Sequence, residues 1–241
     1  MGKVKIKRKS TLIDMTEMRD VTVLLLTFFM LTSTFLQKEP VTVETPSSVS
    51  EEKVSTSNVA QVLVSPEGKV FISITGEADP DAGPGDGAWG SENIRKEILV
   101  AAVNEYNRLH PSKKVAITEK DAEVFSKIGT FGVPFQALPE FLRKSQTEQD
   151  KIISDMSRKD VGIPIDGNTN LDTPNEFQIW MRAIYSSQNE NLTALMKKGE
   201  GITVKAGKDT PYSIMHPVLD NLQTLKMNKF QLMTALKSEN D

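Results

Sequence analysis

The chain contains one segment that is apolar enough to enter a lipid bilayer. Val21 to Leu36 carries no charged residue and consists mainly of Val, Leu, Phe and Met. It is shorter than the ~20 apolar residues that a membrane-spanning helix requires. The only extension toward the N-terminus passes through Asp20 and reaches Leu12. The pattern therefore predicts a transmembrane helix over residues 12–36, with Asp20 inside the membrane or at its cytoplasmic edge.

Asp20 belongs to a polar stripe on this predicted helix. At about 100° per residue, Asp20, Thr27 and Thr34 recur at intervals of seven and stay on one face, with Thr16 close to it. Ionisable groups at membrane depth are rare, face a protein interior or a water-filled cavity, and often mark ion or proton pathways. A polar stripe on a membrane helix also requires a protein partner or water. Asp20 is thus the candidate functional residue, and the three threonines are its candidate polar neighbours.

Two other interpretations of this segment remain open. In the first, Asp20 marks only the aqueous start of a short membrane anchor, and the threonine hydroxyls donate hydrogen bonds to carbonyl groups of their own helix. A cleaved signal peptide would also combine a basic start with an apolar stretch, but the acidic residues Asp14, Glu17 and Asp20 between the two argue against it.

The charges around the segment predict its orientation. Residues 1–11 form a basic tail with five Lys or Arg residues, whereas Lys38 and Glu39 follow the apolar stretch. By the positive-inside rule, the N-terminus stays in the cytoplasm and the rest of the chain is translocated. Residues 37–58 are rich in Pro, Ser, Thr, Val and Glu and predict an extended linker.

Residues beyond the linker predict a small α/β domain. Two β-rich runs, 61–64 and 70–74, flank a turn with Pro66 and Gly68 and predict a hairpin. Near the C-terminus, the sequence predicts a β-α-β unit. It consists of a strand over 201–206, a helix that starts at Thr210-Pro211 and a strand over 230–236.

The region between these units predicts helices. The expected segments are 94–109, a helix from Thr118 and Asp121 to near Gly129, one or two helices in 138–156, and a helix from Thr173-Pro174 through Ser187. The last helix is expected to bury one face, which consists of Phe177, Trp180, Met181, Ile184 and Tyr185. The predicted fold class is α+β, with an α/β domain over 59–76 and 173–241 and a mostly helical insertion over 77–172.

Composition excludes several classes of function. The chain has no Cys, so neither thiol chemistry nor a disulfide is available. Its net charge of -3 and its 6% aromatic content argue against nucleic-acid binding. The two histidines, His110 and His216, have no nucleophile or metal-ligand spacing around them. We therefore expect no enzymatic activity, no metal and no cofactor other than protons.

Two stretches resemble one protein family. Residues 13–20, IDMTEMRD, followed by the apolar run, resemble the membrane anchor of the ExbD/TolR family, and residues 205–212, KAGKDTPY, resemble the closing β-α-β unit of that family. The connectors 131–134 and 162–164 resemble those of a larger-bodied branch. The resemblance implies a single-pass protein of the bacterial inner membrane with a periplasmic domain.

The same resemblance implies a function and a set of partners. Asp20 takes the position of the family's essential membrane aspartate, which binds and releases protons inside a pentameric ExbB-like channel protein. The implied role is that of an ExbD-type subunit of a proton-driven motor, which energises TonB-dependent outer-membrane transport through a TonB-like partner. A second ExbD-like chain, either an identical copy or a paralogue, would complete a dimer.

Alternatives to this role remain. A TolR-like role in envelope constriction is the close relative, and a signal-anchored scaffold or peptidoglycan-binding module without proton coupling belongs to a different class. The anchor also departs from the family pattern, because Glu17 stands where Pro is usual and Arg19 stands where an uncharged residue is usual. Both residues are candidate modulators of Asp20, since Arg19 can reach the cytoplasmic surface, pair with Glu17 or Asp14, or hold Asp20 in its ionised form.

Overall fold

The computed structural model describes residues 15–32, 58–76, 90–187, 190–207 and 210–234. The chain divides into two compact units, Met1–Leu36 and Gln37–Asp241. The predicted linker lies outside the described residues except for Asn58.

The first unit contains a single described helix, α1, which spans Met15–Thr32. Every side chain described in it, from Met18 to Met30, is exposed. Residues 12–14 and 33–36 of the predicted transmembrane segment lie outside the described residues. Within the described parts of the chain, no helix is both long enough and apolar enough to cross a bilayer.

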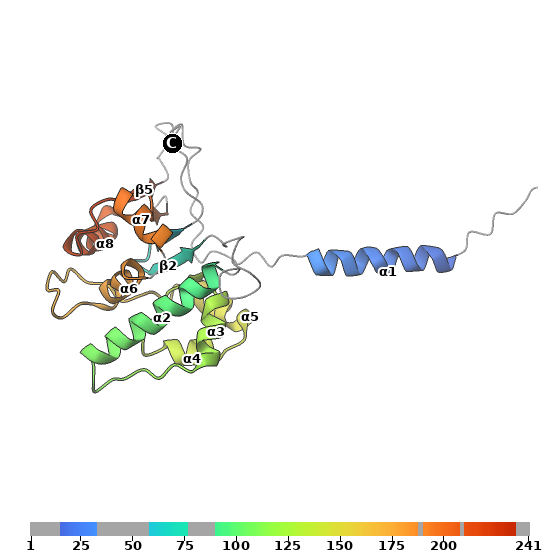
Figure 1. The fold of residues 1–241 in the computed structure, drawn as a ribbon, viewed down its shortest axis with the longest axis horizontal. Helices are drawn as coiled ribbons and strands as arrows, with labels where there is room; N and C mark the ends of the chain where they lie inside the picture. The colour runs from blue at the N-terminus through green and yellow to red at the C-terminus, as the bar shows by residue number, and fades with distance from the viewer. Residues whose placement is uncertain (1–14, 33–57, 77–89, 188–189, 208–209, 235–241) are drawn as a thin grey trace, which may run out of the picture. The chain divides into compact units, whose positions relative to one another are not determined.

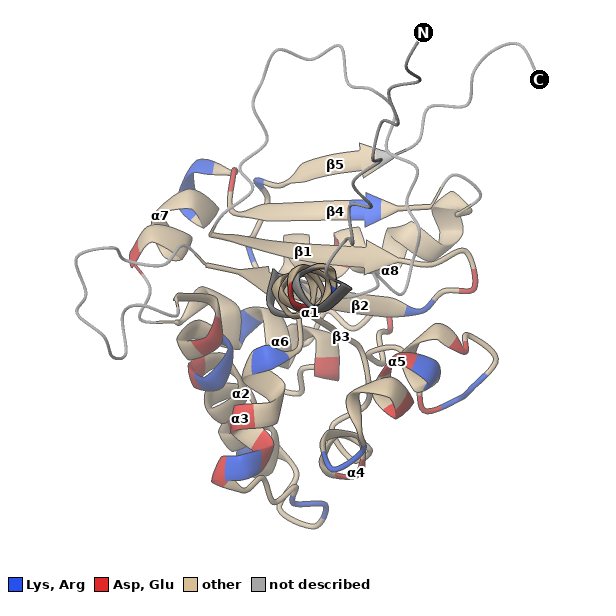
Figure 2. Cartoon of the chain, turned by 90° about the vertical axis from the view of Figure 1, so that its right-hand side faces the viewer, with Lys and Arg blue, Asp and Glu red and all other residues tan. Residues whose placement is uncertain are grey.

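The second unit is built on a five-stranded mixed sheet with the order β3-β2-β1-β4-β5 (Figure 2). The strands are β1 Val59–Val64, β2 Val70–Thr75, β3 Thr130–Phe131, β4 Ile202–Ala206 and β5 Gln231–Thr234. β1 pairs with β2 as an antiparallel hairpin, and β4 pairs in parallel with both β1 and β5. The predicted hairpin and the predicted C-terminal β-α-β unit are therefore both present.

The turn between β1 and β2 forms where the pattern of Pro66 and Gly68 predicts it. The amide of Ser65 donates to the carbonyl of Lys69 at 2.9 Å and closes the turn. Gly68 adopts a φ of 81°, a left-handed conformation that a residue with a side chain rarely takes. In the pairing of β1 with β4, Ala60, Val62 and Val64 lie opposite Ile202, Val204 and Ala206 and build one apolar face of the sheet.

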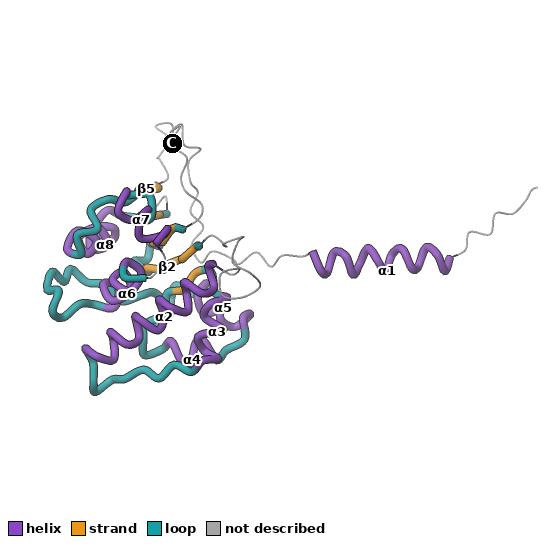
Figure 3. The backbone as a smooth tube through the Cα atoms, in the orientation of Figure 1, coloured by secondary structure: helices purple, strands orange, loops and turns teal. Residues whose placement is uncertain are grey.

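Seven helices are described in this unit (Figure 1). They are α2 Gly90–Leu109, α3 Glu119–Lys127, α4 Leu138–Leu142, α5 Gln146–Ser154, α6 Glu176–Tyr185, α7 Glu190–Lys198 and α8 Tyr212–Thr224. Helices and loops make up most of the chain between β2 and β4 (Figure 3). α8 connects the parallel strands β4 and β5, as the sequence predicted.

Two helix boundaries show how capping sets the start of an element. Thr118 and Asp121 form the predicted capping box of α3, with mutual side-chain to backbone bonds of 3.2 and 2.9 Å. The predicted start of α6 at Thr173-Pro174 is wrong, because Asn175 is the N-cap and the helix begins at Glu176. The side chain of Asn175 accepts the Gln178 amide at 2.8 Å, and this capping box fixes the later start.

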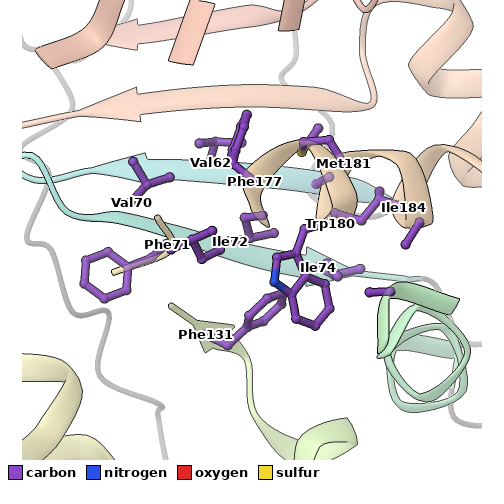
Figure 4. Packing of buried hydrophobic residues seen from close by; sticks show 14 of the residues in the cluster. Val62, Val70, Phe71, Ile72, Ile74, Phe131, Phe177, Trp180, Met181 and Ile184 are labelled. Atoms are coloured by element: carbon purple, nitrogen blue, oxygen red, sulfur yellow. The ribbon is translucent and has the colours of Figure 1, made fainter. Parts of the chain in front are cut away.

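Aromatic side chains form the centre of the core (Figure 4). Trp180 stacks on Phe135 with a centroid distance of 4.9 Å and packs against Phe131 at 4.7 Å. Phe125 also stacks on Trp180, at 5.8 Å. The predicted buried face of α6 is correct for four of its five residues, but Tyr185 is 41% exposed.

The described part of the predicted insertion shares this core. Ile98 and Leu99 of α2 and Phe125 of α3 are fully buried in the same hydrophobic cluster as the residues of β1 and β2. The helices between β2 and β4 therefore complete the core of the sheet. The domain boundaries proposed from the sequence stay predictions, and residues 77–89 lie outside the described residues.

Candidate functional site

Asp20 lies in the second turn of α1. Its side chain is exposed, as is that of its neighbour Arg19. Among the described residues, neither side chain forms an ion pair or a side-chain hydrogen bond. The carboxylate is thus presented on the helix surface, where a partner or an ion could reach it.

The predicted polar stripe is described only in part. Thr27 lies two turns beyond Asp20 on the same side, and its hydroxyl donates to the carbonyl of Leu24 at 2.9 Å. A hydroxyl that donates to its own helix keeps its oxygen as an acceptor for water or for a partner. Thr16 and Glu17 lie in α1, but their side chains are outside the described set, and Thr34 is outside it altogether.

Thr22 is a hydroxyl on α1 that the sequence interpretation did not include. Its Oγ1 lies 2.9 Å from the carbonyl oxygen of Met18 and 2.8 Å from that of Arg19. Such back-bonding satisfies a hydroxyl in apolar surroundings without a second chain. It therefore adds a polar atom to α1 that is satisfied within the helix and does not involve the Asp20 carboxylate.

Apolar side chains cover the rest of α1. The largest exposed fractions belong to Met30 at 75%, Phe29 at 64%, and Leu24 and Leu26 at 62% each. An unpaired carboxylate among apolar side chains is costly to keep charged once water is removed. The helix therefore combines ionisable residues in its first two turns (Glu17, Arg19 and Asp20) with a later surface that lipid or an apolar protein face would cover.

The α/β unit contains a second carboxyl group with unusual surroundings, Glu176 at the first turn of α6. Its Oε2 accepts the backbone amide of Phe135 at 2.8 Å. Burial raises the pKa of this carboxyl above its ordinary 4.5, whereas the Phe135 amide and nearby His110 act in the opposite direction. The sequence analysis missed Glu176, although a carboxylate beside an N-cap and a buried helix face was a usable signal.

The two histidines lie in separate places. His110 stacks on Tyr106 with a centroid distance of 4.5 Å at the end of α2. His216 contacts Asp220 on α8, with Nδ1 and Oδ2 2.7 Å apart. In the described part of the chain, no group of three or more His, Asp or Glu residues is placed to hold a metal.

The family is shown by a sequence match that includes α1. Residues 7–127 match the model of the family described as ExbD, Biopolymer transport protein ExbD/TolR, and this match covers half of the 241 residues. The chain therefore belongs to the ExbD/TolR family. Searches among curated proteins and among solved structures returned no match.

The extent of the match refines the resemblance. The matched residues contain α1 with Asp20, the β1–β2 hairpin and helices α2 and α3. The β4-α8-β5 unit lies beyond them, although its sequence also resembles the family. Membership supports a role in biopolymer transport and within an energising complex, while assignment to a larger-bodied branch stays a prediction.

Proposed function

We propose that this protein is an ExbD-type subunit of an inner-membrane motor driven by the proton-motive force, with Asp20 as the proton-carrying residue. The observation that carries the proposal is the family match over residues 7–127, which includes the helix that holds Asp20. In this proposal, residues 12–36 anchor the chain with the N-terminus in the cytoplasm, and the α/β unit lies in the periplasm.

The physical chemistry of a carboxyl group suits this role. In a desolvated helix bundle the neutral form of a carboxyl group is favoured, whereas water or polar partners favour its charged form. Alternation between the two surroundings makes the residue take up and release a proton. One charge that crosses 100 mV corresponds to ~2.3 kcal/mol, which is enough to bias a helix movement against a few weak contacts.

The proposed partners follow from this mechanism. A multi-span, ExbB-like ring would surround α1, and a second ExbD-like chain would share the ring. A TonB-like protein would receive the movement and drive transport across the outer membrane. A Tol-type system would use the same proton site for a different output, whereas a scaffold that binds peptidoglycan would not need the proton site.

Replacement of Asp20 tests the proton role. Asp20→Asn is nearly isosteric but cannot cycle a proton, so assembly should persist while energised transport falls to background. The measurement is energy-dependent uptake of an outer-membrane substrate in cells that lack the native copy and any paralogue. Co-purification in mild detergent checks that the ring still assembles. Undiminished uptake with Asp20→Asn would contradict the proposal.

Two matched variants separate the proton site from its charged neighbours. Glu17→Gln makes the same carboxylate-to-amide change one turn earlier and should leave most transport intact. Arg19→Ala should also be tolerated if the long side chain only reaches toward the cytoplasmic surface. Loss of transport with Arg19→Ala equal to that with Asp20→Asn, at equal protein levels, would place Arg19 in the proton site.

A further inference from the structure

A groove with cationic walls lies on the α/β unit, far along the chain from Asp20. It has a volume of about 430 Å³ and lies between the segment after α2 and helix α4. Lys113, Lys114 and Arg143 line it, and its lining contains no carboxylate. Because the whole chain has a net charge of -3, this groove is a local concentration of positive charge on an acidic protein.

One wall of the groove is held firmly by α2. The side chain of Asn107 accepts the Val115 amide at 2.7 Å and donates to the Val115 carbonyl at 2.8 Å. The amide of Lys113 also donates to the carbonyl of His110 at 3.0 Å. These bonds fix the backbone from which both lysines project, so ligand binding would not have to order it.

The opposite wall carries Arg143, directly after α4. One guanidinium nitrogen of Arg143 lies 3.7 Å from Asp121, whose carboxylate also accepts the Thr118 amide at 2.9 Å. The Arg143 side chain is 62% exposed, so a ligand in solvent has access to it. Within the described part of the chain, the ammonium groups of Lys113 and Lys114 form no ion pair or hydrogen bond.

The groove lining also contains apolar residues. Val115, which is buried, and Pro139 both belong to it. Gln136 adds an amide whose Nε2 donates weakly to the Tyr106 hydroxyl at 3.4 Å. Two flexible ammonium groups, one planar guanidinium and these apolar residues suit a ligand that offers carboxylates along a short chain.

We propose that this groove binds an acidic peptide segment of a protein partner. A carboxylate of the peptide pairs with Arg143, a second one pairs with Lys113 or Lys114, and an apolar part of the peptide contacts Val115 and Pro139. The concave shape favours an extended peptide over a flat lipid surface. This site is separate from the proton role of Asp20, so either proposal can fail without the other.

Peptide binding to the full-length protein in detergent tests this proposal. The probe is a fluorescein-labelled hexaglutamate peptide, measured by fluorescence anisotropy at 50 mM and 300 mM salt. Binding should weaken as salt rises, because exposed ion pairs are screened. The double variant Lys113→Gln with Lys114→Gln should weaken binding about tenfold, since it removes both ammonium groups with which the second carboxylate can pair.

A matched control distinguishes a site from general attraction. Lys197 and Lys198 are also adjacent exposed lysines but lie at the end of α7, outside the groove. Changing both to Gln alters the net charge equally and should leave peptide affinity unchanged. Equal weakening by both double variants would overturn the proposal, as would absence of binding by the unaltered protein at 50 mM salt.

A competition experiment separates peptide recognition from binding of any small anion. Inorganic phosphate, added at the same concentration of negative charge as unlabelled hexaglutamate, should displace the labelled peptide much less effectively. Equal displacement by phosphate would show a small-anion site and would contradict the peptide assignment. Arg143→Gln should weaken peptide binding further in the background of the lysine double variant.

Discussion

The two units of this protein differ in how far their apolar side chains are exposed. In α1, Leu24, Leu26 and Phe29 are each about 60% exposed, and no described side chain of the helix is buried. In the α/β unit, residues of the same types, such as Leu99 and Phe125, have no exposed surface. One unit satisfies the hydrophobic effect within its own fold, whereas the described helix of the other leaves its apolar side chains exposed within that unit.

Because of this difference, we expect different properties of the side chains to matter in the two units. In the α/β unit, side-chain shape matters because neighbouring residues pack at high density. On α1, we expect the chemistry of Asp20 and the overall apolar character to matter more than the fit to any described neighbour. Substitutions of the same type should therefore have different consequences in the two units.

The largest expected effect comes from the centre of the aromatic cluster. Trp180→Ala removes stacking on Phe125 and Phe135 and leaves a cavity, so it should lower the free energy of unfolding by about 3–5 kcal/mol. Tyr185→Ala on the same helix removes a side chain that is 41% exposed and should cost about 1 kcal/mol or less. Urea unfolding followed by far-ultraviolet circular dichroism measures both, and equal losses would contradict the described core.

A pair of leucines tests the comparison between the units directly. Leu99→Ala in α2 should cost about 2–5 kcal/mol, because Leu99 is fully buried. Leu26→Ala in α1 makes the same change in another helix and should leave the unfolding of the α/β unit unaltered. The measurement is urea unfolding of the full chain in detergent, with Trp fluorescence as the signal. A comparable loss from Leu26→Ala would show that α1 contributes to the stability of the α/β unit.

The smallest expected effect is a pH dependence of the free energy of unfolding of the α/β unit. Because burial raises the pKa of Glu176 in the folded state, ionisation of this group penalises folding. The penalty is absent below the unfolded pKa near 4.5 and is complete above the folded pKa. The contribution of Glu176 to the free energy of unfolding should therefore fall as pH rises through this window.

Glu176→Gln should remove this pH dependence, because the amide does not ionise. The difference in unfolding free energy between the unaltered protein and the variant should decrease as pH rises from 4.5 to 8. Glu105→Gln is the control of opposite sign, since a hydrogen bond from Arg108 lowers the pKa of Glu105. The contribution of Glu105 to the free energy of unfolding is present above its unfolded pKa and is lost as pH falls through its folded pKa. Parallel pH profiles for the two variants would refute the assigned surroundings of Glu176.

Local signals in the sequence were sufficient for several elements. The capping box of Thr118 and Asp121 and the turn around Gly68 involve residues only a few positions apart, and both occur as predicted. The start of α6 was mispredicted because Thr173-Pro174 and Asn175 are both acceptable starts. Asn175 also donates to Asn221 at 2.9 Å, a contact between distant parts of the chain that no local pattern reveals.

Other features depended on tertiary structure in a similar way. Helical spacing placed Tyr185 on the buried face, but at the last residue of α6 it is partly exposed. Helix α7 was missed because only Leu192 and Met196 are buried in it, which is a weak periodic signal. The cationic groove joins residues near 113 with residues near 143, so only the folded chain reveals it. The proton role of Asp20 stays a prediction, carried by the family resemblance and by the cost of a carboxylate in lipid.

The parallel pairing of β1 with β4 also determines when the sheet can be completed during synthesis. Residues 60–64 cannot pair with residues 202–206 before the latter are synthesised. The central strand β1 therefore lacks one neighbour until most of the chain has been made. Pairing over such a separation is entropically costly and slows folding. During this interval the backbone N–H and C=O groups along that edge of β1 are unpaired, which exposes the nascent chain to pairing with a wrong strand.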